Sequence, residues 1–334
     1  MYDIRDIKQL HLEISTLCNA RCPQCPRNFC GYPYNDGYPE CNLTLEQVHK
    51  IFKPTFIKQL VWFHINGNYG DMVMNPETTD IIRYFKTHNP KLMITVCTNG
   101  SARQPDFWQE LAELDCEIEF ALDGLEDTHD MYRQNTNWHT VIRNAQTFIS
   151  AGGHAIWKFI EFNHNQHQIT DCETMSKKLG FIKFMKVDHG RNQGAVYDRQ
   201  GKLRHVLGDY KTNHTDIDHA ITERKQKVMS IVDIQETPRD FVICHAKKSN
   251  EIFVTATGEV YPCCWLGMYP QTNTGFGTDL QIINQQLQPM IHNNNALEHE
   301  LEDCIAWFNR IEQSWSCSTY QDGRLIQCDR VCGK

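Results

Sequence analysis

Short apolar runs alternate with longer amphipathic stretches over the first two-thirds of the chain. Each run has the length of a buried strand, and each stretch repeats its apolar positions every three or four residues, as an α-helix does. We expect strands at residues 11–17, 60–66, 92–98, 117–122, 155–162 and 182–187. We expect helices from Thr44, in a Thr44-Leu-Glu-Gln47 capping box, and over residues 77–87, 105–114, 138–151 and 171–179.

Strands that alternate with helices predict a parallel sheet, because a helix is the usual crossover between parallel strands. The pattern predicts an α/β fold with a curved sheet, and it leaves open a partial barrel or a doubly wound sheet. Ligands gather at the carboxyl ends of the strands in both. The alternation fades near residue 193, and we expect a bridging segment over 193–239 with one helix near 217–230. A small hairpin is expected around Thr257-Gly258 in the last part, residues 240–334.

Composition narrows the class of protein. The 334 residues are 40% hydrophobic and 22% charged, as in ordinary globular proteins. The net charge of −8 disfavours nucleic acid as a partner. No apolar run is long enough to span a bilayer and the first residues hold no apolar signal segment, so we expect a cytoplasmic protein without a membrane partner.

Fifteen cysteines are distributed unevenly along the chain. One group lies within residues 18–41 and a second within residues 244–332, while only Cys97, Cys116 and Cys172 lie between them. In a large chain without a signal segment such groups indicate metal sites or catalysis rather than disulfides. We therefore expect two metal sites, with Cys97 and Cys116 as small buried core residues.

The first group contains the run Cys18-Asn-Ala-Arg-Cys22-Pro-Gln-Cys25, directly after the first expected strand. It offers three thiolates where a cubane iron–sulfur cluster needs four ligands. Catalytic metal sites commonly keep one such position open for a small molecule. A zinc site completed by Cys30 or Cys41 is the alternative, and these two cysteines have no other assigned role.

In this context the chain resembles the radical S-adenosylmethionine (SAM) enzyme superfamily. Besides the CxxxCxxC spacing, three strand ends match the family in order: Asn66-Gly67-Asn68-Tyr69-Gly70-Asp71, Thr98-Asn99-Gly100 and Leu122-Asp123-Gly124. The chain departs from the family at Gln24, where an aromatic residue is usual, and at Tyr69-Gly70-Asp71, where the family has Glu-Pro. The resemblance covers about residues 10–190. It implies that residues 1–192 form a partial (β/α)6 TIM-like barrel.

The resemblance also implies the cofactors and their contacts. A [4Fe–4S] cluster would be held by Cys18, Cys22 and Cys25, with SAM on its remaining iron. Candidate SAM contacts lie at or beyond the strand ends: Asn66, Gly67, Asp71, Asn99, Asp123, Arg133 and Glu161. Asp71 would stand in for the Glu that holds the SAM amino group, while Asp123 and Arg133 also have structural interpretations as turn or helix-cap residues. We expect His64 and His129 to be structural, and no catalytic residue is identified.

The second cysteine group resembles the auxiliary-cluster domain called SPASM when it holds two clusters and Twitch when it holds one. The hairpin at Gly258 would bring two of the cysteines together, and a terminal pair would close the site. The resemblance implies an auxiliary [4Fe–4S] cluster held by Cys244, Cys263, Cys328 and Cys332, with Cys317 or Cys264 as alternates. A small α+β tail folded around zinc would have the same sequence signature and stays open.

Together these features predict a radical SAM enzyme that cleaves SAM reductively and abstracts a substrate hydrogen through a 5′-deoxyadenosyl radical. The expected outcome is oxidative modification of a peptide. A small-molecule dehydrogenase of the same superfamily is the alternative, followed by a non-catalytic iron–sulfur or zinc protein. The enzyme would need an electron donor, either a reductase or a flavodoxin or ferredoxin.

Overall fold

We describe the protein from a computed structural model that covers residues 2–34, 37–188, 194–230, 237–268 and 280–334. Its centre is a sheet of eight strands in the order β12-β11-β1-β4-β5-β6-β7-β8. The strands are β1 (Gln9–Leu12), β4 (Trp62–Ile65), β5 (Met93–Thr98), β6 (Glu117–Ala121), β7 (His154–Ile160), β8 (Lys183–Val187), β11 (Glu251–Val254) and β12 (Val260–Tyr261).

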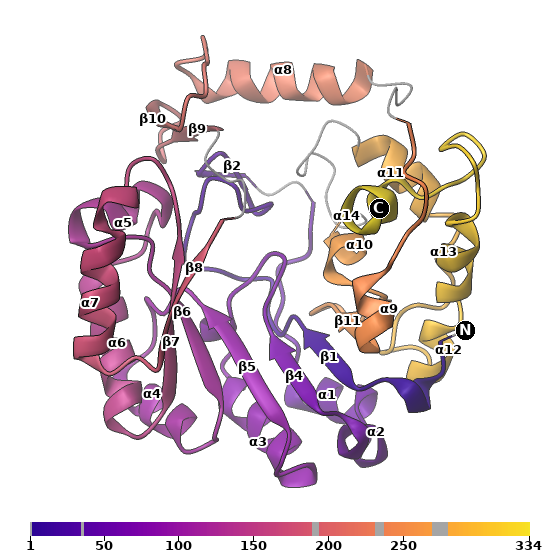
Figure 1. Ribbon diagram of the computed structural model, residues 1–334, viewed down its shortest axis with the longest axis horizontal. Helices are drawn as coiled ribbons and strands as arrows, with labels where there is room; N and C mark the ends of the chain where they lie inside the picture. The colour runs from indigo at the N-terminus through magenta and orange to yellow at the C-terminus, as the bar shows by residue number, and fades with distance from the viewer. Residues whose placement is uncertain (1, 35–36, 189–193, 231–236, 269–279) are drawn as a thin grey trace.

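The six strands from β1 to β8 are parallel and lie side by side in chain order. A doubly wound sheet reverses its strand order at a switch point, and these six strands do not. The helices between the strands are α1 (Leu45–Ile51), α2 (Pro54–Gln59), α3 (Thr78–His88), α4 (Pro105–Ala112), α5 (Glu126–Tyr132), α6 (Trp138–Ser150) and α7 (Ile169–Leu179). They lie along one side of the curved sheet (Figure 1). The partial barrel is therefore confirmed over the doubly wound alternative.

The C-terminal part is joined to the barrel through the sheet itself. Strand β11 pairs in parallel with β1, with Gln9 opposite Glu251, and β12 returns antiparallel beside it. Figure 1 shows short helices gathered around this edge. They are α9 (His245–Ser249), α10 (Cys264–Met268), α11 (Leu280–Leu287), α12 (Leu301–Ile305), α13 (Phe308–Ser314) and α14 (Ile326–Cys332). The hairpin at Thr257-Gly258 was expected, but its pairing with the first strand was not.

Two local expectations differ from the structure. The first strand ends at Leu12 rather than at residue 17, because Thr16 N–H bonds to the Cys41 carbonyl and Ser15 bridges Asn42 instead of a strand neighbour. The bridging segment contains α8 (Ile217–Ser230), as expected, but also an antiparallel pair, β9 (Gly194–Tyr197) and β10 (Leu203–Leu207). The capping box at Thr44 and Gln47 is confirmed.

The two faces of the barrel sheet differ in chemistry. Side chains on the helix-covered face, such as Phe63, Val96 and Trp157, are fully buried in the main hydrophobic core. The alternate residues point the opposite way, as strand geometry requires. On this face Ile156 and Ile160 of β7 are apolar and buried, but several other side chains are polar and only partly buried. They include His64, Cys97, Glu119 and Lys158. Within the described ranges, no helix combines the length and apolar character needed to cross a membrane.

Candidate cluster and cofactor site

The three cysteines of the front motif lie on the loop that follows β1. The amide of Cys25 closes a turn onto the carbonyl of Cys22 at 3.0 Å. Their side chains pack with an apolar group drawn from the ends of α5 and β7 and from β9 and β10: Tyr132, Ile160, Phe162, Val196 and Leu207. Burial raises the pKa of the Cys18 thiol, and the charges of Asp71, Cys25 and Cys22 raise it further. The loop thus holds three thiols close together in a largely apolar setting.

Two nitrogen donors point at these sulfur atoms. Asn99 Nδ2 donates to Cys18 Sγ at 3.7 Å, and Arg133 Nη1 donates to Cys22 Sγ at 3.7 Å. Hydrogen bonds to sulfur stabilise thiolates and tune iron–sulfur clusters. Among the described residues, no three His, Cys, Asp or Glu side chains surround one point as ligands of a single metal ion. A cubane cluster places each thiolate on a different iron atom, so the three thiols and their donors fit such a cluster.

A buried carboxylate organises the glycine-containing loop after β4. Glu13 Oε1 accepts hydrogen bonds from the amides of Tyr69 at 2.7 Å and Gly70 at 3.2 Å. A Cβ on Gly67 would lie 2.6 Å from the same oxygen, and one on Gly70 would lie 1.7 Å from the Ser15 carbonyl oxygen. Both glycines are therefore required for this close approach. The sequence pattern did not single out Glu13, because it is one polar residue within the expected strand over residues 11–17.

The loop continues to Asp71, and both of its carboxylate oxygens already accept hydrogen bonds. Its Oδ1 accepts from the Val73 amide and the Thr98 hydroxyl, and its Oδ2 accepts from the amide and side chain of Asn99. A carboxylate has about four acceptor positions, and these donors occupy them. Burial raises the pKa of Asp71 despite these bonds. Asp71 thus ties the loop to the end of β5, where Asn99 also reaches Asn19 Oδ1 at 2.9 Å.

The next two predicted residues form a buried ion pair. Arg133 Nε donates to Asp123 Oδ2 at 2.6 Å, and Asp123 Oδ1 accepts from the Ile160 amide at 2.7 Å. Burial alone would lower the pKa of Arg133, but Asp123 and Cys22 outweigh it and raise the pKa. The pair links the end of β6 to the cysteine loop. Glu161 lies apart from it at the β7 edge, paired with Lys186 at 2.8 Å.

The two histidines were expected to be structural. His129 Nδ1 accepts from the Asp123 amide at 3.3 Å, and its other nitrogen lies 3.0 Å from the Thr136 hydroxyl. His64 Nδ1 lies 2.7 Å from the Thr95 hydroxyl on the neighbouring strand. Burial lowers the pKa of His64 to about 4 and that of His129 to about 3, so both rings are neutral at physiological pH.

Five cysteines of the second group line one cavity in the C-terminal part. They include the four expected as ligands, Cys244, Cys263, Cys328 and Cys332. Cys244 caps α9, while Cys328 and Cys332 lie one turn apart on the same face of α14. Cys264 also lines this cavity, whereas Cys317 is not among its lining residues.

The walls of this cavity are largely apolar, with Trp265, Leu266, Ile311 and Trp315 among them. A hydrogen bond between the two thiols lowers the pKa of Cys332 and raises that of Cys244. Burial raises the pKa of Cys328 and brings that of Cys263 to about 12. The topology therefore gathers the four expected thiols, together with Cys264, from separate segments around one cavity.

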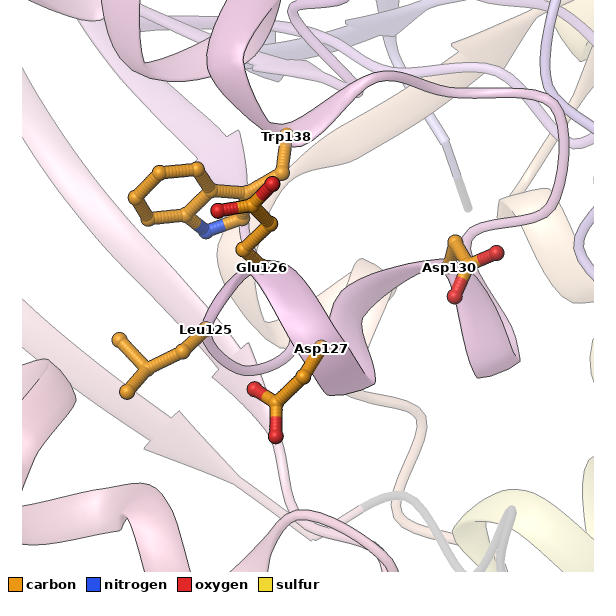
Figure 2. A pocket seen from close by; sticks show the side chains of 5 residues that line it. All are labelled: Leu125, Glu126, Asp127, Asp130 and Trp138. Atoms are coloured by element: carbon orange, nitrogen blue, oxygen red, sulfur yellow. The ribbon is translucent and has the colours of Figure 1, made fainter.

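A further cavity lies over α5 and the first residue of α6 (Figure 2). It is lined by Leu125, Glu126, Asp127, Asp130 and Trp138. Figure 2 shows Glu126 beside the Trp138 ring, with Asp127 and Asp130 directed elsewhere. It contains no predicted site residue, and carboxylates alone do not identify a ligand.

The chain is similar to known proteins in sequence and in fold. The model of the radical SAM superfamily matches residues 12–162, which include the front cysteines and the ends of β4 to β7. A comparison with curated proteins gave no match. Among solved structures, Streptococcus suis SuiB bound to S-adenosylmethionine is 12% identical with a TM-score of 0.58, over 96% of this chain and 72% of SuiB. The enzyme anSMEcpe with bound AdoMet is 13% identical with a TM-score of 0.55, over 95% of this chain and 85% of its own. At these identities the likeness establishes a shared fold.

Proposed function

The chain belongs to the radical SAM superfamily, and from this premise we propose that it cleaves SAM reductively to modify a peptide by oxidation. One observation carries the proposal. The thiols of Cys18, Cys22 and Cys25 lie together at the carboxyl edge of the barrel, and nitrogen donors from Asn99 and Arg133 point at two of them. This donor set is suited to a cluster with one iron left for SAM.

When bound, the cluster supplies the electron that splits the SAM sulfonium into methionine and a 5′-deoxyadenosyl radical, which takes a hydrogen atom from substrate. The chain's own residues hold and orient the reactants. Gly67 and Gly70 keep side chains out of the loop after β4, so that its backbone can approach SAM. Tyr132 and Phe162 pack around the thiols and exclude water from the reaction.

We assign SAM contacts and their positioning to Asn66, Gly67, Asp71, Asn99, Asp123, Arg133 and Glu161. The carboxyl edge of a parallel barrel supports this set, because ligands of such sheets bind there. Asp71 and Asp123 act mainly by fixing Asn99 and Arg133, since both carboxylates already accept hydrogen bonds. Glu161, paired with Lys186, borders the same edge.

We further propose an auxiliary [4Fe–4S] cluster held by Cys244, Cys263, Cys328 and Cys332. Their shared cavity in the C-terminal part supports it. Four thiolates would close the cluster completely. Such a cluster would accept the electron that the substrate radical releases, and an external reductase, flavodoxin or ferredoxin would supply the front cluster.

A peptide substrate is supported by two of the similar structures. SuiB has been solved bound to its precursor peptide SuiA, at a TM-score of 0.57 to this chain, and anSMEcpe with its Cp18Cys peptide, at 0.54. Each is 12% identical to this chain and aligned over 96% of it. This chain thus shares its fold with two proteins whose structures contain a bound peptide.

Anaerobic reconstitution with iron and sulfide tests the proposal. We expect about eight iron atoms per chain, from two cubane clusters, and reductant-dependent formation of 5′-deoxyadenosine. A triple Cys18, Cys22 and Cys25 to Ala variant should abolish the product and retain about four irons. Tightly bound zinc without SAM cleavage would contradict the enzyme. About four irons with intact cleavage would remove the auxiliary cluster alone.

The substrate class needs a separate measurement. Deuterated candidate peptides and deuterated small metabolites are incubated with the reconstituted enzyme, SAM and reductant. Transfer of deuterium from a peptide into 5′-deoxyadenosine supports the proposal, because this transfer reports the abstracted hydrogen directly. Transfer from a small metabolite alone would replace peptide modification with small-molecule oxidation.

A further inference from the structure

The inner face of the barrel sheet carries a cluster of polar side chains that the proposed function has not used. On β5 the residues of the helix-covered face, Ile94 and Val96, are fully buried, whereas Thr95 and Cys97 on the other face are only partly so. A parallel sheet covered on both faces is apolar on both. The polar, partly exposed Thr95 and Cys97 therefore indicate that no apolar layer covers this face of β5.

Cys97 forms hydrogen bonds with one side chain on β6 and one on β7. Its thiol donates to Glu119 Oε2 at 2.8 Å, and Lys158 Nζ donates to Cys97 Sγ at 3.6 Å. Lys158 also donates to Glu119 Oε2 at 2.7 Å, which closes a three-membered network. His64 Nε2 lies 4.0 Å from the sulfur. This network holds the thiol in one orientation.

The thiol is kept protonated. Burial raises the pKa of Cys97 to about 12, with Lys158 acting to lower it and Glu119 to raise it. Cys97 lies two residues before Asn99, or about 7 Å along an extended chain, and Asn99 Nδ2 contacts Cys18 Sγ. The strand that carries the thiol therefore ends at the front cysteines, on whose cluster the proposed radical would form.

We propose that Cys97 is a hydrogen-atom donor within the reaction cavity, which reduces the 5′-deoxyadenosyl radical when that radical forms without substrate. The inference rests on the proposed cleavage of SAM. Glu119 and Lys158 are positioning residues, because they orient and protonate the thiol without meeting the radical. The activity protects the chain, since an unquenched radical would attack carbon–hydrogen bonds of the cavity wall.

The step balances in atoms and electrons. The S–H bond of Cys97 breaks homolytically and a C5′–H bond forms, which leaves 5′-deoxyadenosine and a thiyl radical. One electron from the same low-potential one-electron reductant that feeds the front cluster, and one proton from the Lys158 ammonium, restore the thiol. Lys158 then recovers its proton from solvent.

Uncoupled turnover in D2O tests this directly. The reconstituted enzyme is given SAM and dithionite in D2O, without substrate and without added thiols. Because an S–H group exchanges with solvent, wild-type 5′-deoxyadenosine should carry one deuterium. Cys97→Ala and Cys97→Ser should both lose this label, since neither offers a hydrogen that the radical abstracts easily. Freeze-quenched wild type should also show a thiyl radical in its electron paramagnetic resonance spectrum.

Cys116→Ala is the matched control, because Cys116 is buried on the helix side and donates to the Leu111 carbonyl. Its product should keep the label. A label that persists in both Cys97 variants would overturn the inference. If the wild type forms no 5′-deoxyadenosine, the proposed function fails and this inference fails with it. That outcome differs from a persistent label, which overturns this inference alone.

The positioning roles have a readout that does not depend on turnover. Iodoacetamide alkylation of Cys97 is followed by mass spectrometry in the reconstituted enzyme before SAM is added. Glu119→Gln should speed alkylation, because it removes a negative charge that keeps the thiol protonated, and Lys158→Met should slow it. Loosened packing would instead speed alkylation in both variants. Faster alkylation in both would therefore contradict the positioning roles.

Discussion

At the scale of single residues, the site depends on buried charges that local sequence patterns do not mark. Glu13 is fully buried, and its Oε2 has no hydrogen-bond partner among the described residues. Asp123 is fully buried as well, but it is paired with Arg133. A buried charge is costly unless it is paired or neutralised, so these two carboxylates have different consequences for stability.

Glu13 makes folding stability depend on pH. Burial raises the pKa of Glu13 to about 7 from its usual 4.5, although backbone N–H groups of the loop act against the shift. The folded state then binds a proton that the unfolded state releases between these values, so stability falls as pH rises through this window. The shift corresponds to roughly 3 kcal/mol. Glu13→Gln should lack this dependence.

Urea unfolding of the reconstituted protein from pH 4 to pH 8 measures the effect. The stability of Glu13→Gln relative to wild type should increase by about 3 kcal/mol over the range. Glu173→Gln, at an exposed carboxylate paired with Lys177, serves as the control and should follow wild type. Parallel curves for wild type and Glu13→Gln would contradict the prediction.

Arg133 should matter for stability as well as for the cluster. Arg133→Met leaves Asp123 charged and unpaired in the interior, which costs about 3–5 kcal/mol. Adding Asp123→Asn should recover part of that loss, because the amide keeps an acceptor for the Ile160 N–H without a charge. Denaturant unfolding of the two single variants and the double variant gives the coupling. Additive losses would show that the pair is not a stabilising unit.

At the scale of elements, the loop after β4 connects the barrel to the C-terminal part. The Tyr69 hydroxyl donates to the Met268 carbonyl at the end of α10, and Asn68 Nδ2 donates to the Cys264 carbonyl at 2.9 Å. The Tyr69 ring also stacks on Tyr38, with centroids 5.1 Å apart. The loop after β4 is thus held by hydrogen bonds to α10 and by the stacking of Tyr69 on Tyr38. A change in α10 would move this loop.

Tyr69→Phe should therefore weaken SAM binding. It removes one hydrogen bond, which contributes about 0.5–1.5 kcal/mol, so the Kd for SAM should rise by up to about ten-fold. Equilibrium dialysis of the reconstituted enzyme measures this Kd. Tyr84→Phe removes a comparable bond to the Phe52 carbonyl on the helix side and should leave the Kd unchanged. Equal effects of the two variants would refute the link.

At the scale of the whole molecule, the two cysteine groups belong to one connected structure. The sheet passes from β7 and β8 through β1 to β11, and α10 contacts the loop after β4. An auxiliary cluster would stabilise the segments that supply its thiolates, because metal binding and folding are coupled. Its loss should affect the loop after β4 but not the opposite edge of the sheet.

Cys244→Ser tests this coupling. We expect iron to fall from about eight to about four per chain. Hydrogen exchange should increase in α9, α10, α14 and the loop of Asn68 and Tyr69, while β6 and β7 keep their protection. Cys304→Ser is the control, because Cys304 is a buried cysteine of α12 outside the cavity. Unchanged exchange in the loop would contradict the connection between the two sites.

The sequence by itself determined the barrel strands and the front motif, because both are local: a strand shows as an apolar run, and the cysteine spacing lies within eight residues. The hairpin at Gly258, whose turn is local, also led us to expect Cys244 and Cys263 near each other, and both line one cavity. Only the tertiary structure decided that β11 pairs with β1, that Glu13 lies under the glycine loop, and that Cys97 joins Glu119 and Lys158. Cys97 was expected in the core, yet it lies partly buried on the polar inner face. Each of these depends on strand neighbours far apart in the chain, and the period of a strand does not say which of its faces meets helices and which a cavity.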